Sequence, residues 1–193
     1  MNPKLFHPVI HLPPDYEVYD FSKGYDPHRT LSSPFGVGKF LEKRPNMYTQ
    51  EQFTKNNRNI HMGVDIGAPV GTPIHAFEDG EVHSFTYNHL PGDYGYTLIT
   101  KNSALGKTLY CLHGHLSKRS IENKSIGQKF QRGEVIAWVG DKHENGGWNP
   151  HLHFQISIQQ PEVCDMPGAV SEADLEQSLK IYLDPRLILG NIY

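Results

Sequence analysis

The stretch NPHLHFQI, residues 149–156, carries two histidines one residue apart inside an apolar run. In a strand, successive side chains point to opposite faces, so Leu152 and Phe154 would face a core while His151 and His153 share the other face. Alternation of this kind over a short run predicts a β-strand. Two imidazoles side by side suit a metal site or a catalytic pair, although a solvated strand face would explain them equally well.

The rest of the chain predicts an all-β domain. Short apolar or β-branched runs alternate with Gly, Pro, Asn and Asp, as is typical of strands joined by turns. We predict an N-terminal extension over residues 1–30, a domain over 31–160, and a C-terminal helix and tail over 161–193. The helix is expected in SEADLEQSLKIYL, residues 171–183, because Ser171 is a plausible N-cap and leucines recur every four residues.

Composition limits the possible partners. The 193 residues are enough for one domain with a real core, and the net charge of −3 without a Lys/Arg cluster argues against nucleic acid. Cys111 and Cys164 form no CxxC pair and are expected as free thiols. Proline and histidine interrupt every apolar run in residues 1–18, so we predict no signal peptide, no membrane span and a cytoplasmic location, unless a leader has been removed.

Two further clusters contain residues that can do chemistry. In HMGVD, His61 and Asp65 flank an extended segment and form a zinc-competent pair, although a surface histidine beside a turn aspartate is an alternative. In YCLHGHLS, His113 and His115 are predicted to share one face of a strand. Either imidazole could act as a general base near neutral pH, but we expect His113 to be a half-exposed strand residue.

Along the chain the motifs come in the order HMGVD, HGHLS, PHLHF. The segment SPFGVG precedes the first motif. Two longer segments lie between the first and last motifs, GVDIGAPVGTPIHAFEDGEV, which begins within HMGVD, and IGQKFQRGEVIAWVG. These motifs and segments, in this order, resemble those of the M23 metallopeptidases, the LytM- and lysostaphin-type zinc endopeptidases. The resemblance covers about residues 32–158. Three motifs in order are more specific than any one alone. The resemblance implies an antiparallel β-sandwich-like core with an open groove.

Carried over by position, the resemblance implies that Zn²⁺ is bound by His61, Asp65 and His153, and that His115 and His151 are catalytic. It implies zinc-dependent hydrolysis of peptide (amide) bonds in a peptide or peptidoglycan-like substrate. One of the two catalytic histidines is expected to accept a proton from the attacking water, and the other to hydrogen-bond the tetrahedral oxyanion. The sequence leaves open which does which.

Some positions depart from the family pattern S.FG.R and HLHFE. No arginine follows FG in FGVGKF, and Gln155 stands where glutamate is usual. The loop before PHLHF is long, contains His143 and Trp148, and is expected to border the cleft. The sequence of this loop and of the following PHLHFQ resembles that of a divergent, cytoplasmic-type branch of the family. Alternatives are a non-catalytic LytM-like interaction module, or a zinc hydrolase of a small cytoplasmic peptide or amide. An N-terminal ligand such as His28 or Asn2 could also cover the site.

The remaining histidines are expected to lie outside the site. His75 and His83 alternate with apolar residues and are expected on strand faces or in hydrogen bonds. Tyr94 and Tyr96 are expected either to line a groove or to pack in the core. Loops are expected to carry His7, His11, His28 and His89.

Overall fold

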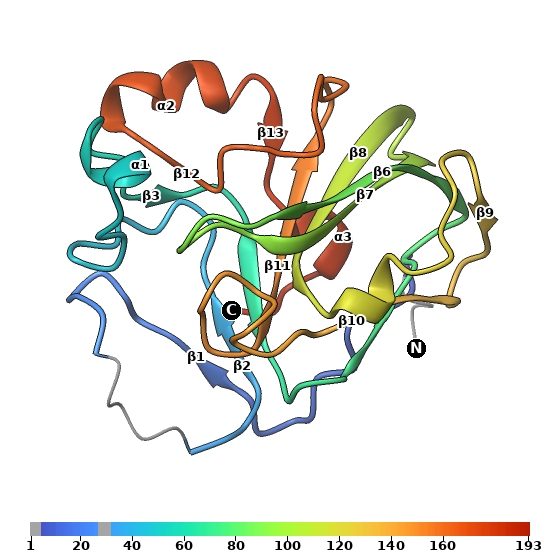
Figure 1. Ribbon diagram of the computed structural model, residues 1–193, viewed down its shortest axis with the longest axis horizontal. Coiled ribbons are helices and arrows are strands. Elements are labelled where there is room, and N and C mark those ends of the chain that lie inside the picture. Colours follow the sequence, from blue (N-terminus) through green and yellow to red (C-terminus); the bar gives the residue numbers. More distant parts are fainter. Residues whose placement is uncertain (1–4, 27–31) are drawn as a thin grey trace.

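The computed structural model describes residues 5–26 and 32–193, and the chain is mainly β, as its sequence predicts (Figure 1). Within these residues, one large sheet has the strand order β1-β2-β4-β11-β8-β7-β6-β9, and β13 also pairs with β11. Its neighbours are antiparallel except for the parallel pair β1–β2. The strands are β1 (Glu17–Val18), β2 (Gly36–Gly38), β4 (Val64–Gly67), β6 (Gly80–Asn88), β7 (Gly95–Ala104), β8 (Lys107–Leu116), β9 (Lys129–Phe130), β11 (His151–Ser157) and β13 (Tyr182–Leu183).

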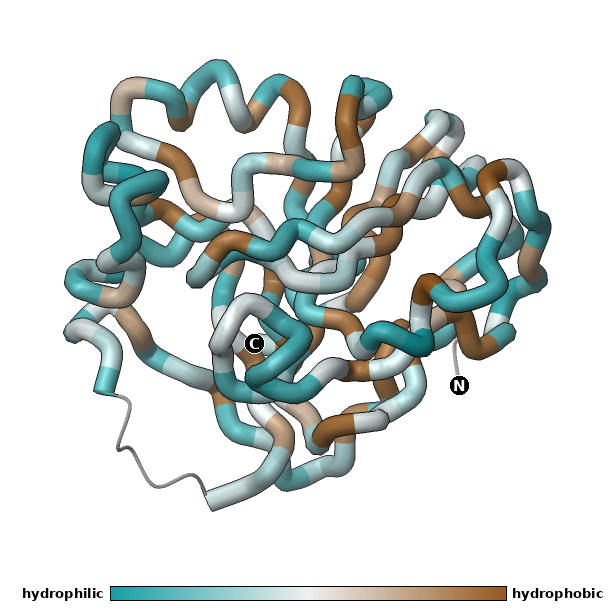
Figure 2. Tube along the Cα trace, viewed as in Figure 1, coloured by the Kyte–Doolittle hydropathy of each residue, from teal (hydrophilic) through white to brown (hydrophobic). Residues whose placement is uncertain are grey.

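A second, smaller layer covers one face of this sheet. It contains the antiparallel pair of β5 (Pro73–His75) and β10 (Val135–Trp138). The main core lies between the two layers and joins Ile74 and Ile136 to Leu152 and Phe154 of the sheet. Figure 2 shows hydrophobic segments distributed among hydrophilic ones along the whole trace. The predicted alternation in PHLHF is therefore confirmed, since Leu152 and Phe154 are fully buried in this core.

The described part of the N-terminal extension packs tightly on the domain. Phe6, Val9 and Ile10 belong to the main core, and β1 extends the edge of the large sheet. The boundaries of the three predicted segments stay a prediction. None of the helices in the described ranges is long and apolar enough to cross a membrane.

The C-terminal helix is present but shorter than predicted. In α2 (Glu172–Ser178), the Ser171 hydroxyl caps the helix by accepting the Asp174 N–H at 3.2 Å. The predicted extension to residue 183 is wrong, because Tyr182–Leu183 form β13 against the end of β11. Since β4 pairs with β11 only as far as Phe154, the following residues have an open edge that β13 fills. The remaining short elements are α1 (Glu51–Thr54), a 3₁₀ turn (Lys118–Ser120), α3 (Arg186–Leu189), and the pair of β3 (Ile60–His61) and β12 (Ala169–Val170).

The prediction that His113 and His115 share one face of a strand is wrong, and so is the expected half-exposure of His113. His113 lies opposite Phe154 in the register of β8 and β11, fully buried, with the two ring centroids 5.3 Å apart. His115 has a φ of 63°, in the left-handed region that interrupts strand alternation. Its side chain therefore lies near His151 and His153 instead of in the core.

Replacing His113 by leucine should remove part of the acid sensitivity of the fold. Burial lowers the pKa of His113 to about 4. As the pH falls below the unfolded pKa of about 6.5, the unfolded chain therefore takes up a proton that the folded chain does not, which costs about 2 kcal/mol by pH 5. Urea unfolding should show His113→Leu gaining about that much relative to the parent protein between pH 7.5 and pH 5. The exposed His89→Leu is the control, and parallel pH slopes for His113→Leu and the parent would contradict the expectation.

Candidate functional site

Three strands bring the predicted metal ligands together. His61 ends β3, Asp65 lies on β4 and His153 lies on β11, where it is the direct cross-strand partner of Asp65. All three side chains are buried. Close approach is possible because residue 63 is glycine: a Cβ there would lie 2.5 Å from the His153 ring. Gly63 thus lets the His153 ring lie directly against the backbone between His61 and Asp65.

The three side chains form a compact triangle of donor atoms. The His61 Nε2 lies 3.1 Å from both the Asp65 Oδ1 and the His153 Nδ1, and the last two atoms are 3.0 Å apart. Donors around a tetrahedral zinc ion with bonds of about 2.0–2.1 Å are about 3.3 Å apart. A small expansion of the triangle therefore accommodates a metal ion, and these residues form a group able to hold one.

Hydrogen bonds to the opposite ring nitrogens fix which nitrogen of each histidine faces the triangle. His61 donates its Nδ1–H to the Lys39 carbonyl oxygen at 2.9 Å, which leaves Nε2 unprotonated. His153 donates its Nε2–H to the Gln155 side-chain oxygen at 3.0 Å, which leaves Nδ1 unprotonated. Metal-bound histidines commonly donate their second N–H in this way. The donor set and its tautomers therefore fit a divalent metal.

Gln155 has a defined place in this arrangement. It is fully buried, two residues beyond His153 on the same face of β11, and its amide nitrogen donates to the Pro167 carbonyl oxygen at 3.4 Å. That contact turns the amide so that its oxygen faces His153. The departure from the usual glutamate thus preserves the hydrogen-bond acceptor and removes one negative charge beside His153, a predicted metal ligand.

The buried Arg44, which sequence reasoning missed, holds the Asp65 carboxylate from the side opposite the histidines. Its Nη1–H donates to Asp65 Oδ2 at 2.7 Å, and its Nε–H donates to Glu42 Oε2 at 3.0 Å. In the pattern S.FG.R, the arginine position falls on Gly38, and a Cβ on Gly38 would lie 2.7 Å from the Arg44 Nη2. The guanidinium therefore occupies the space beside Gly38, although it comes from a later position in the chain.

Charge and burial set the protonation states of these groups. Burial alone would raise the pKa of Asp65, but His61 and Arg44 hold it well below its ordinary value. Burial, assisted by the positive charge of Arg44, lowers the pKa of His61 to about 4. At neutral pH the carboxylate is therefore ionised and the imidazole is neutral, the states in which both bind metals.

The two predicted catalytic histidines lie together beside the triangle. The ring centroids of His115 and His151 are 4.2 Å apart, and the His151 Nε2 lies 3.8 Å from Asp65 Oδ1. His115 donates its Nδ1–H to the Asn145 carbonyl oxygen at 2.8 Å, and His151 donates its own to that of Asn149 at 2.7 Å. In both rings the unprotonated nitrogen of the neutral form is therefore Nε2.

The pKa values of His115 and His151 are lowered to different extents. Burial, together with the charges of His151 and His153, lowers the pKa of His115 well below its ordinary value. Burial also lowers the pKa of His151, but the Asp65 carboxylate counteracts part of this effect, and the side chain stays 17% exposed. His151 is therefore the easier of the two to protonate.

A cleft of about 180 Å³ exposes this site, and its lining includes all five predicted site residues. Tyr94 forms one wall, with its hydroxyl 3.4 Å from the His153 Nε2 and donating to the Met166 carbonyl oxygen at 3.0 Å. Tyr96 packs elsewhere, stacked on Tyr87 at 4.3 Å. Trp148 lines the cleft, which confirms that its loop borders the site, whereas His143 is exposed and is not part of the lining.

The N-terminal extension forms part of a second, neighbouring cavity of about 380 Å³, which shares Met47, Asp65, Trp148 and His151 with the first. Tyr19 and Phe21, from the N-terminal extension, are among its lining residues. Among the described residues, no N-terminal side chain joins the triangle of metal ligands. The two proposed N-terminal ligands lie outside the described residues, namely Asn2 and His28.

Comparison with known proteins supports the resemblance seen in the motifs. The family model described as Peptidase family M23 matches residues 59–164, a range that includes all five predicted site residues. The DD-carboxypeptidase/endopeptidase Mpg of Neisseria meningitidis serogroup B is 31% identical over 150 residues, covering 78% of this chain and 29% of the relative. The peptidoglycan DD-endopeptidase ShyC of Vibrio cholerae is 33% identical over 115 residues, covering 58% and 24%.

Among solved structures, the catalytic domain of the prophage-encoded M23 protein EnpA from Enterococcus faecalis is 24% identical, with a TM-score of 0.49. That alignment covers 72% of this chain and 92% of the EnpA chain. This chain spans less than a third of the two curated relatives named above. The family prediction is confirmed, while the roles of the individual site residues stay predictions.

Removing the acceptor at Gln155 should weaken metal binding. In Gln155→Leu nothing replaces the oxygen that holds the His153 Nε2–H, so we expect zinc affinity at the triangle to fall about 10–100-fold. Gln155→Glu keeps an acceptor and should bind zinc at least as tightly as the parent protein. Competition with a chromophoric chelator measures both, with His61→Ala defining the signal without the triangle. Unchanged affinity in Gln155→Leu would contradict the role assigned to Gln155.

Removing Arg44 should destabilise the fold, and an arginine at position 38 should restore it. Arg44→Ala leaves the buried Asp65 carboxylate without its guanidinium and Glu42 with Lys39 as its remaining cation, a loss of about 3–5 kcal/mol. Adding Gly38→Arg refills the vacated space and should recover most of that loss, as measured by denaturant unfolding of the metal-free protein. Gly38→Arg alone should destabilise, because both side chains then compete for one space. A double variant no more stable than Arg44→Ala would contradict the equivalence of the two positions.

Proposed function

Because the chain belongs to peptidase family M23, we propose that it is a zinc-dependent hydrolase that cleaves peptide (amide) bonds in a peptide or peptidoglycan-like substrate. One observation carries the proposal. The donor atoms of His61, Asp65 and His153 lie within 3.1 Å of one another, and two neutral imidazoles with unprotonated Nε2 atoms lie beside them. Metal-assisted hydrolysis requires this combination of a three-ligand site and a nearby base.

We propose Zn²⁺ as the ion, since two imidazoles and one carboxylate are a donor set found in catalytic zinc sites. When bound, zinc supplies a Lewis acid that lowers the pKa of a water molecule to about 7 and polarises a carbonyl group. The chain's part is to hold the donors in their metal-binding tautomers. Lys39 and Gln155 do this through the hydrogen bonds that they accept from His61 and His153.

We assign the general base to His151. Its Nε2 is unprotonated in the neutral ring, and Asp65 at 3.8 Å stabilises the imidazolium that forms on proton uptake. His151 accepts one proton of the attacking water as the water oxygen bonds to the carbonyl carbon. The imidazolium then passes this proton to the amine nitrogen as the carbon–nitrogen bond breaks.

His115 has a different task in this scheme. It is the more deeply buried of the pair and donates its Nδ1–H to the Asn145 carbonyl oxygen, so its neutral Nε2 can only accept. With the two rings 4.2 Å apart, a proton on His151 disfavours a second one on His115. The His115 Nε2 therefore accepts a hydrogen bond from the second O–H of the attacking water. This hydrogen bond orients a lone pair of the water oxygen toward the substrate. The oxyanion role was expected for the histidine that is not the base, but in this scheme it also belongs to His151: the Nε2–H of its imidazolium hydrogen-bonds the oxyanion before the proton passes to the amine.

The surroundings of the site support an extended substrate. The cleft at the triangle and the neighbouring cavity share His151 and Trp148, so a chain lying across His151 has walls on both sides. The name of the Vibrio cholerae relative, peptidoglycan DD-endopeptidase ShyC, points to peptidoglycan peptides as the class of substrate. We propose such peptides for this protein too. If it is cytoplasmic, as we predict, its substrate is a soluble peptide or amide of that kind and not the intact wall.

Alanine at either catalytic position should abolish turnover and leave the metal in place. Because neither His115 nor His151 belongs to the triangle, we expect each variant to keep its zinc and lose at least about 100-fold in turnover. His61→Ala and His153→Ala should lose both the metal of this site and activity. Zinc analysis by mass spectrometry and chromatography of products from purified peptidoglycan, and from a soluble cross-linked muropeptide, measure the two properties.

The controls separate the alternatives. His143→Ala alters an exposed histidine of the neighbouring loop and should retain parent activity on either substrate. A zinc-loaded parent protein that cleaves neither substrate would favour a non-catalytic interaction module. Cleavage of the muropeptide alone, combined with cytoplasmic fractionation of the native protein, would support the soluble substrate. Zinc loss in His151→Ala would contradict the division of roles within HLH.

A further inference from the structure

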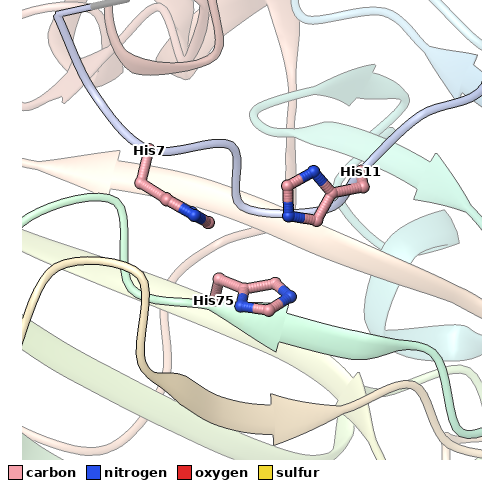
Figure 3. A group of neighbouring side chains, drawn as sticks. All are labelled: His7, His11 and His75. Atoms are coloured by element: carbon pink, nitrogen blue, oxygen red, sulfur yellow. The ribbon is translucent and has the colours of Figure 1, made fainter.

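We propose that His7, His11 and His75 form a second metal site, which binds Zn²⁺ or a similar divalent transition-metal ion. The site is independent of the proposed function. None of the three residues lines either cavity beside the triangle. Figure 3 shows the three imidazoles gathered between the N-terminal segment, which carries His7 and His11, and the end of β5, which carries His75.

The geometry of the group suits a single ion. One donor atom from each residue lies within 4.8 Å of the other two. The ring centroids are 5.1–5.4 Å apart, and no two rings are stacked in parallel. Donors on a tetrahedral zinc ion are about 3.3 Å apart, so modest side-chain rotations close the set. His11 is exposed and has room for such a rotation.

Two of the three rings are held in a metal-binding tautomer. His7 donates its Nδ1–H to the Pro8 carbonyl oxygen at 2.9 Å, and His75 donates its own to that of Gly133 at 3.1 Å. In both neutral rings the lone pair is therefore on Nε2. A backbone carbonyl that accepts the second N–H is the usual partner of a metal-bound histidine, and His61 at the triangle has the same arrangement.

Gly133 helps to fix the positions of two of these rings. Its carbonyl oxygen accepts the bond from His75, and a Cβ on it would lie 3.2 Å from the His7 ring. With a φ of 82°, it has a conformation that favours glycine. The tight turn before β10 thus touches one ligand and orients another.

Backbone hydrogen bonds hold the two segments in register before any ion binds. The His7 N–H donates to the Phe77 carbonyl oxygen at 3.0 Å, and the His75 N–H donates to the Val9 carbonyl oxygen at 2.8 Å. A preformed site loses little conformational entropy when the ion binds. The bound ion would join the N-terminal segment to β5, with solvent as the fourth ligand. Three imidazoles suit zinc, cobalt, nickel or copper and do not suit calcium or magnesium.

The test counts metal ions with the triangle disabled. His61→Ala, stripped with a chelator, reloaded with Zn²⁺ and desalted, should hold one zinc per chain. Adding His11→Ala or His75→Gln should reduce this to none, whereas adding His89→Ala, at another exposed histidine, should leave one. Circular dichroism confirms that each variant is folded. Absence of zinc from His61→Ala, or retention of one zinc after His11→Ala, would overturn the proposal. Because activity is not measured, the outcome does not depend on the proposed function.

Hydrogen exchange supplies a second measurement on the otherwise unaltered chain. Zinc at 100 times its Kd should slow the local opening that exposes the His7 and His75 amides about 100-fold. His11→Ala should abolish this protection, and His89→Ala should preserve it. Equal exchange with and without zinc in the parent protein would also overturn the proposal.

Discussion

The register of β11 between β4 and β8 is the constraint on which both the core and the site depend. It places His153 opposite Asp65 on one side and opposite Gly114 on the other. The same register sends Leu152 and Phe154 into the main core. A slip of one residue would exchange the two faces, moving imidazoles into the core and apolar side chains into the cleft. The free energy of core packing therefore also holds the candidate ligands in position.

Burial then sets the charge states. A low-dielectric interior disfavours every charged form, so burial lowers the pKa values of His61, His115 and His151, and the Asp65 carboxylate counteracts only part of this effect. Asp65 nevertheless stays ionised because His61 and Arg44 lower its pKa, and the Arg44 guanidinium donates to its Oδ2 at 2.7 Å. Arg44 in turn requires Glu42, its second buried partner. One connected set of charges thus keeps a carboxylate ionised next to neutral imidazoles, as metal binding requires.

Backbone carbonyl oxygens orient most of the imidazoles. His61, His115 and His151 each donate Nδ1–H to a carbonyl oxygen of a connecting segment, and His7 and His75 do the same at the second cluster. His153 is different, because it uses Nε2–H and a side-chain acceptor, Gln155. The position that departs from the family pattern is therefore the one at which a side chain, and not the backbone, selects the tautomer. An amide performs that selection without adding charge.

The sequence by itself determined the features that depend on neighbouring residues. Alternation in PHLHF predicted a strand with a core face and a histidine face, and Ser171 predicted the start of α2. The ordered motifs predicted the family and the residues of the cleft. In YCLHGHLS, by contrast, the same alternation was misleading, because the left-handed backbone at His115 separates its side chain from that of His113.

Only the tertiary structure decided which distant residues meet. It buried Arg44 against Asp65, although a charged residue in a loop ordinarily suggests solvent. It also brought His75 to His7 and His11, two segments predicted as unrelated loop and strand positions. Alternation and helix capping arise from adjacent residues and are visible in sequence. Burial and contact between remote segments result from the packing of the whole chain, so no local pattern records them.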